Sequence, residues 1–276
     1  MYSRIRLVFL CLALTWAPSI ATAEVVPDAV AALGASEIAR VTEIVDGDTV
    51  VLADGRQVRL VGIQAPKLPL GRAGFEAWPL AEEAKAALSA LSLGREVRLA
   101  YGGRRGDRHG RLLAHLVDES SVGRGGGQGG SWVQGALLKE GMARVYSFQD
   151  NRALVPEMLA HEAVARESRR GIWADPFYAV RTPEEAGRYL GRFELIQGRV
   201  RDVAIVRGRV YLNFGADWRS DFTASLASAV RRLFESEQID VLSYRGRIVR
   251  VRGWLKSRNG PMVDITHPEQ IEVIPE

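Results

Sequence analysis

Residues Ile44–Lys67 read IVDGDTVVLADGRQVRLVGIQAPK, and their order of β-branched runs, glycine turns and charges anchors the interpretation of the rest of the chain. The runs Thr49–Leu52 and Val58–Ile63 flank Ala53-Asp54-Gly55. Asp-Gly between two such runs is typical of a β-hairpin, because both residues tolerate the backbone angles of a tight turn. We therefore expect two neighbouring antiparallel strands here.

Two carboxylates, Asp46 and Asp48, flank Gly47 just before the first run, and Arg59 lies in the second run. A carboxylate pair beside an arginine at the mouth of a small barrel is a set of groups that can bind a phosphodiester and a divalent cation. Asp-Gly-Asp alone is also ordinary turn chemistry. The interpretation therefore depends on the order and spacing of the whole stretch.

This order of motifs resembles the thermonuclease (staphylococcal nuclease-like) family. The segments that carry the resemblance are VDGDTV, RLVGIQAPK, DRHGR at Asp107–Arg111, WVQGALLKEGMARV at Trp132–Val145 and GIW at Gly171–Trp173. The resemblance covers residues 40–175. It implies an OB-fold barrel with helices that acts on DNA or RNA phosphodiesters by endonuclease-type hydrolysis.

The resemblance also implies roles for single residues. Arg59 and Arg111 match the family's two arginines, which stabilise charge on the phosphorane oxygens. Asp48 matches a carboxylate that ligates calcium, and Asp46 matches the acid that supports the site from behind. Both arginines are therefore candidate catalytic residues.

The turn Gln64-Ala65-Pro66-Lys67 departs from the family's Asp-Thr/Ala-Pro-Glu pattern. The amide oxygen of Gln64 can ligate calcium but brings no charge, and calcium affinity falls with the number of carboxylates. A lysine is protonated at neutral pH, so Lys67 repels a cation and cannot act as a base. Calcium is therefore expected to bind weakly, at Asp48, Asp46 and Gln64.

Three interpretations follow from this turn. In the first, a metal-assisted nuclease persists, with Glu76, Glu82 or Glu83 replacing the missing acids. In the second, the charge of Lys67 takes the role of the cation in a slow, metal-independent phosphodiesterase. In the third, hydrolysis is lost and an OB-fold protein that binds nucleic acid or another polyanion remains. A glutamate within reach of Asp48 would favour the enzyme, whereas Lys67 in the metal position would favour the binding protein.

The loop before Arg111 adds candidate binding residues. Arg108 and His109 lie in this loop and are predicted to contact phosphate or nucleotide, as is Lys67. The alternative for His109 is a solvated loop histidine. In the absence of any Ser-His-Asp order or nucleophile elbow, the sequence argues against a serine hydrolase.

The amino terminus has the pattern of a secretory signal peptide. Two arginines precede the apolar run Leu7–Ala17, and Ala21-Thr22-Ala23 is an A-x-A cleavage site. We therefore expect residues 1–23 to be removed on export to the periplasm or the medium, and residues 24–39 to form a leader. The one cysteine, Cys11, lies in the signal, so no disulfide or thiolate metal site is expected in the mature chain.

The length of 276 residues, 47% of them hydrophobic, allows two domains. The 37 basic residues exceed the 33 acidic ones too little to predict a strongly basic surface. Hydrophobic patterning predicts strands at 41–45, 49–52, 58–63, 96–101 and 112–117 and helices at 79–91, 132–140 and 155–170. After a linker at 176–192, strands around one helix at 225–236 predict a second small OB-like or β-barrel module over 193–276.

The second module contains another candidate site for nucleic acid. Alternation along a strand at 249–254 places Arg250, Arg252 and Trp254 on one face. Arginines that flank a tryptophan bind single-stranded nucleic acid by charge and stacking. The alternative is a solvated strand face with Trp254 packed against a neighbouring loop.

Overall fold

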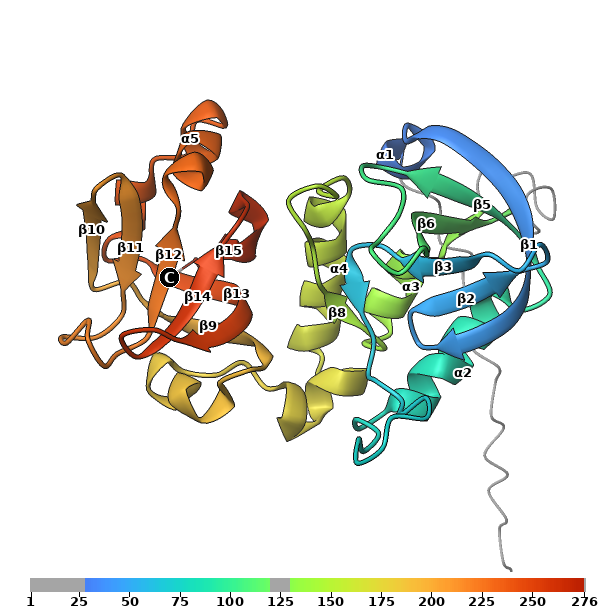
Figure 1. Ribbon diagram of the computed structural model, residues 1–276, viewed down its shortest axis with the longest axis horizontal. Helices are drawn as coiled ribbons and strands as arrows, with labels where there is room; N and C mark the ends of the chain where they lie inside the picture. The colour runs from blue at the N-terminus through green and yellow to red at the C-terminus, as the bar shows by residue number, and fades with distance from the viewer. Residues whose placement is uncertain (1–27, 120–129, 276) are drawn as a thin grey trace, which may run out of the picture.

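The computed structural model describes residues 28–119 and 130–275, so the expected signal peptide lies outside the described residues. Figure 1 shows two β-rich modules side by side, with helix α4 (Val155–Glu167) between them. Within the described ranges no helix is long and apolar enough to cross a membrane.

The first module is a barrel with helices, as the sequence predicted. Its strands are β1 (Gly34–Asp46), β2 (Thr49–Leu52), β3 (Gln57–Leu60), β5 (Glu96–Tyr101), β6 (Leu112–Asp118) and β7 (Ser131–Trp132). They follow the order β3-β2-β1-β5-β6-β7, and a parallel pairing of β3 with β6 closes the barrel. Strand β1 begins at Gly34, inside the segment expected to be a leader.

The predicted hairpin is confirmed at β2 and β3. Gly55 adopts a φ of 85°, which favours glycine, and its N–H donates to the Leu52 carbonyl at 2.9 Å. The antiparallel register pairs Thr49 with Arg59. Because alternate residues face inward, Val50, Leu52, Val58 and Leu60 are fully or almost fully buried.

Besides the short helix α1 (Asp28–Ala31), three longer helices and a short ribbon pack around the barrel. The helices are α2 (Ala81–Ser92), α3 (Val133–Lys139) and α4, and the ribbon pairs β4 (Ile63–Gln64) with β8 (Arg144–Val145). Helix α3 ends before Gly141 and α4 before Gly171, whose backbones meet where Ile172 N–H donates to the Gly141 carbonyl at 2.8 Å. A Cβ on either glycine would meet backbone atoms at 2.2 Å, so this crossing requires glycine.

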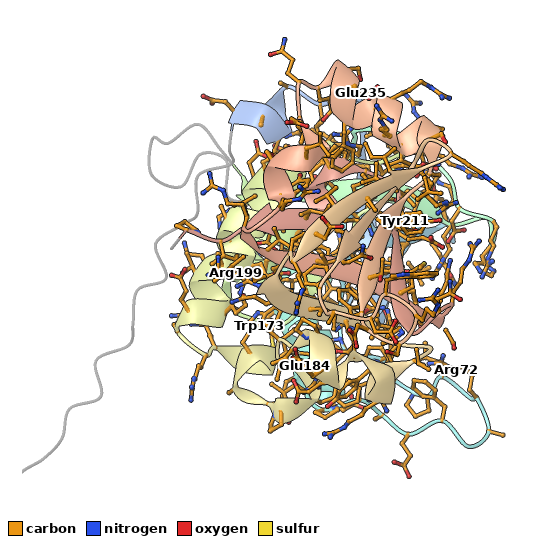
Figure 2. All side chains as sticks on the ribbon, turned by 90° about the vertical axis from the view of Figure 1, so that its left-hand side faces the viewer. Arg72, Trp173, Glu184, Arg199, Tyr211 and Glu235 are labelled. Atoms are coloured by element: carbon orange, nitrogen blue, oxygen red, sulfur yellow. The ribbon has the colours of Figure 1, made fainter. Side chains whose placement is uncertain are left out.

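The second module is also β-rich. Its elements are β9 (Phe193–Arg199), β10 (Asp202–Val206), β11 (Arg209–Asn213), β12 (Thr223–Leu226), β13 (Ile248–Ser257), β14 (Pro261–Ile265), β15 (Ile271–Val273) and helix α5 (Ser228–Ser236). The order is β10-β11-β12-β14-β13-β15, with β9 also paired to β13. In Figure 2 Tyr211 of β11 lies on the sheet that faces the viewer, whereas Arg72 projects from a loop of the first module at the lower edge.

The segment between the modules is folded onto them. It contains the short helices η3 (Pro176–Tyr178) and η4 (Pro183–Tyr189), and Arg181 exchanges backbone hydrogen bonds of 2.8 Å with Leu195 and Gln197 of β9. A separate apolar cluster joins the modules; its buried members are Ala165, Ile172, Trp173, Tyr178, Phe193 and Leu195. Each module therefore has its own core, and this third cluster connects them.

Candidate functional site

Asp48 lies fully buried at the start of the hairpin. Its carboxylate accepts the Ala65 N–H at 2.7 Å, and the carboxylate of Asp46 accepts the Asp48 N–H at 3.1 Å. The turn is tight because a Cβ on Gly47 would lie only 2.7 Å from Cβ of Ala65 and 2.8 Å from Cβ of Ala84. The close approach fixes both carboxylates against the turn that begins at Gln64.

Lys67 occupies the space in front of these carboxylates. Its Nζ lies 2.6 Å from Oδ2 and 2.7 Å from Oδ1 of Asp48, and 3.3 Å from Oδ2 of Asp46. The Lys67 side chain is 21% exposed, so its charge reaches the surface. A single cationic group thus spans both oxygens of Asp48, where a metal ion would need free lone pairs.

Arg59 is the second cation of the site. One Nη donates to the Leu60 carbonyl and the other to the Ile63 carbonyl, both at 2.7 Å. The latter nitrogen also lies 3.2 Å from Oδ2 of Asp48. These contacts fix the guanidinium at the end of β3 and leave 13% of the side chain exposed.

Arg111 lies directly before the neighbouring strand β6. In the parallel pairing of β3 with β6, Arg59 is opposite Leu113. Arg111 precedes Leu113 by two residues, so it lies beside the paired segments of β3 and β6. The Asp107 carboxylate lies 2.7 Å from the Arg111 guanidinium, which retains 29% exposure. Both predicted arginines therefore belong to the segments that meet where β3 pairs with β6.

Arg108 and His109 lie exposed in the loop before Arg111. Their side chains contact each other, with Arg108 Nε donating to His109 Nε2 at 3.0 Å. The carboxylate of Asp107 accepts the N–H groups of His109 and Arg111 at 2.8 and 3.0 Å, which holds the loop in shape. Both residues are available to a ligand, and their predicted binding role stays a prediction.

The pKa values of the two carboxylates shift in opposite directions. Burial raises the pKa of Asp46, and the adjacent charge of Asp48 raises it further. Burial also opposes ionisation of Asp48, but the charges of Arg59 and Lys67, with hydrogen bonds from Lys67 and the Ala65 N–H, lower its pKa to about 2. Asp48 is therefore ionised at neutral pH, and the cations that keep it so are fixed parts of the fold.

Gln64 does not face this cluster. Its amide oxygen accepts hydrogen bonds from Arg144 Nε at 3.0 Å and Nη2 at 2.8 Å. Arg144 is buried, and its guanidinium lies 4.9 Å from the ring centroid of Phe193 and 5.8 Å from that of Tyr178. Burial lowers the pKa of Arg144 to about 10. Sequence reasoning missed Arg144 because its partner is 80 positions away.

The residues present do not fit calcium. Lys67 spans the oxygens of Asp48, and the Gln64 oxygen is bound to Arg144. Glu76, Glu82 and Glu83 are exposed. Across residues 28–119 and 130–275 no three His, Cys, Asp or Glu side chains gather in a way that could hold a metal ion. Neither Gln64 nor a replacement glutamate therefore completes a calcium site with Asp46 and Asp48.

The predicted nucleic-acid role of Arg250 and Arg252 is wrong. Arg252 is 1% exposed, and its guanidinium lies 2.9 Å from Glu162 of α4 while also pairing with Glu272. Arg250 is 11% exposed and lies 3.3 Å from Glu272. The alternation of side chains along β13 was predicted correctly. The strand face that carries the two arginines is not solvated, because α4 of the first module covers it. Only Trp254 of the three stays exposed.

A barrel closed by β3 and β6, with two arginines and a buried carboxylate at one end, defines a nuclease-type OB fold. The model of the staphylococcal nuclease homologue family matches residues 57–175. The chain is 37% identical over 139 residues to Protein ParB of Escherichia coli, covering 49% of this chain and 72% of ParB. It belongs to the staphylococcal nuclease homologue family.

Two further relatives have nuclease names. An uncharacterized endonuclease of Escherichia coli O157:H7 is 30% identical over 141 residues, covering 49% of this chain and 76% of the relative. A micrococcal nuclease of Shigella flexneri is 31% identical over 139 residues, covering 49% and 73%. At the level of the family, the activity is nucleic-acid hydrolysis.

Proposed function

We propose that this protein binds the phosphodiester backbone of DNA or RNA at Arg59 and Arg111, and that it has lost calcium-dependent hydrolysis. The observation that carries the proposal is the position of Lys67 Nζ, 2.6 and 2.7 Å from the two oxygens of Asp48. This lysine neutralises the carboxylate that would otherwise repel a phosphate. The charge that a bound cation would supply is thereby built into the chain.

The cluster is suited to anion binding and lacks a group to activate water. Lys67 contacts Asp46 and Asp48 as a donor, so it is not available to accept a proton from water. The side chains of Lys67 and Arg111 are partly exposed, so their N–H groups can donate to a bound phosphate. A positioned general base typically contributes about 10²–10⁴-fold to rate, so its absence predicts binding without efficient cleavage.

A slow, metal-independent phosphodiesterase is the second candidate function. It is favoured by the partial exposure of Lys67, whose charge lies beside Arg59 and could stabilise a developing oxyanion. The two candidates differ in one measurable property, which is cleavage that resists a chelator.

We also propose that the protein is exported, on the strength of the pattern in residues 1–23.

The test uses protein that starts at Glu24 and labelled single-stranded DNA and RNA, with calcium and separately with a chelator. Arg111→Met removes a cation from the site, and Arg56→Met is the matched control because Arg56 is 42% exposed in the turn Asp54–Arg56, away from Asp48. We expect salt-sensitive binding that weakens about tenfold in Arg111→Met and is unchanged in Arg56→Met. Calcium-dependent cleavage that Arg111→Met abolishes would overturn the proposal.

A further inference from the structure

An exposed tryptophan of the second module lies against the first module. Trp254 of β13 is 46% exposed, and its indole N–H donates to the hydroxyl of Tyr146 at 2.8 Å. Its ring meets Phe193 in a T-shaped contact with centroids 6.5 Å apart. The hydrogen bond fixes the orientation of a ring that is nearly half in solvent.

Phe148 extends this aromatic surface in the first module. It is 48% exposed and meets Tyr146 in a T-shaped contact at 4.8 Å. Tyr146 follows β8, and its backbone N–H donates to the Gly62 carbonyl at 2.8 Å. The next residue, Ile63, accepts a hydrogen bond from Arg59 through its carbonyl. Exposed aromatic rings from both modules therefore flank a residue that is anchored beside the candidate phosphate site.

The aromatic surface continues into the arginine-rich loop. Phe148 forms a β-bridge with Asn151, and Asn151 Nδ2 donates to the Arg104 carbonyl at 3.0 Å. The Arg104 N–H donates to the Asp150 carbonyl, also at 3.0 Å. Exposed basic side chains in this loop are Arg104, Arg105 and Arg108, and Arg111 follows directly. The backbone of the arginine-rich loop is thus hydrogen-bonded to the segment that carries Phe148.

We propose that Trp254 completes a site for single-stranded nucleic acid that spans both modules. Phosphates lie along the arginine-rich loop, and unpaired bases stack on the exposed rings of Phe148 and Trp254. This arrangement favours single strands because the bases of a duplex are already stacked and cannot reach side-chain rings. The inference rests on the proposed function and adds that the second module takes part in binding.

Binding is measured by fluorescence anisotropy with labelled oligothymidine and, separately, with a duplex. Trp254→Leu keeps an apolar side chain but removes the aromatic face, whereas Trp254→Phe keeps a smaller face. Trp218→Leu is the matched control, because Trp218 is 48% exposed in a loop of the second module. We expect Trp254→Leu to weaken single-strand binding about tenfold, Trp254→Phe to recover much of it, and Trp218→Leu to match the wild type.

Intrinsic fluorescence provides a second readout that does not depend on the leucine variant being folded. Oligothymidine is expected to quench the wild-type emission, Trp254→Phe to lose most of that quenching, and Trp218→Phe to keep it. Equal effects of the Trp254 and Trp218 variants, while Arg111→Met still weakens binding, would overturn this inference and leave the proposed function intact. Failure of the wild type to bind either nucleic acid would overturn both.

Discussion

The ammonium nitrogen of Lys67 lies 2.6 Å from one oxygen and 2.7 Å from the other oxygen of Asp48, a carboxylate with no exposed side-chain surface. The two residues are 19 positions apart, and the tight turn at Gly47 brings their segments together. This ion pair places a covalently attached cation against the carboxylate. Its charge cannot be removed by a chelator.

Lys67→Glu should create a calcium response that the wild type lacks. The substitution removes the competing cation and places a third carboxylate beside Asp46 and Asp48, the type of ligand set that calcium binds. Without calcium, the variant should be less stable than the wild type because three acids then face one another. Calcium at about 100 times its dissociation constant should restore about 2.7 kcal/mol.

The check is the melting temperature in calcium and in chelator. Lys67→Gln is the control, since it removes the lysine without adding an acid and should show no calcium effect. A calcium-dependent rise in the wild-type melting temperature would contradict the prediction, because it would mean that the ion displaces Lys67.

Asp48→Asn should change how stability depends on pH. The pKa of Asp48 falls from 3.8 to about 2 on folding, so its contribution is complete above pH 3.8 and is lost as the pH falls toward 2. The wild type should therefore exceed the variant by about 2 kcal/mol more at pH 5 than at pH 2. The raised pKa of Asp46 acts in the opposite direction, and because the charge of Asp48 contributes to that rise, the variant also loses part of this opposing effect. Urea unfolding across this range measures the difference, and a constant gap would refute the assignment.

Local patterns predicted much of the first module. The Asp-Gly turn, the alternation in β2 and β3, and Gly171 after α4 depend on neighbours in the chain, so single-sequence reasoning could place them. The position of Arg59 relative to Asp48 followed from the hairpin. The sequence did not decide whether Lys67 contacts Asp48. The conformation of the turn that carries Lys67 depends on the packing of Gly47 against Ala65 and Ala84, which local patterns do not give.

Side-chain contacts between residues far apart in the sequence could not be predicted from local sequence patterns. Arg252 and Glu162 are 90 positions apart, and Arg144 and Gln64 are 80 apart. An arginine buried in an ion pair looks the same in sequence as an arginine on a solvated strand, since alternation gives only the face and not what covers it. The boundary at Gly34 was missed for a related reason, because β1 extends to pair with β5 in a way that its composition does not indicate.

Gly47→Ala should destabilise the site although its backbone angles are ordinary. The added methyl would lie 2.7 Å from Cβ of Ala65, whose N–H binds Asp48, so it would push the turn of Lys67 away from the carboxylates. We expect a loss of about 1–3 kcal/mol and weaker nucleic-acid binding. Gly34→Ala is the control, since nothing lies within 4 Å of its added methyl. Equal chemical denaturation midpoints for the two variants would disprove the steric argument.

Glu162→Gln should uncouple the two modules. Glu162 is fully buried and accepts from Arg252 at 2.9 and 3.1 Å and from the Val145 N–H at 2.6 Å. The charges of Arg252 and Arg166 lower the pKa of this carboxyl against the effect of burial, so it is ionised. Its neutralisation leaves buried Arg252 paired with Glu272 alone. Breaking a buried pair typically costs about 3–5 kcal/mol, and the remaining contact with Glu272 reduces that cost. We expect calorimetry to show one transition for the wild type and two for the variant.

Arg170→Met, which breaks an exposed pair with Glu140, is the control; it should cost less than about 1 kcal/mol and keep one transition. A single, unshifted transition in Glu162→Gln would show that the apolar cluster alone joins the modules.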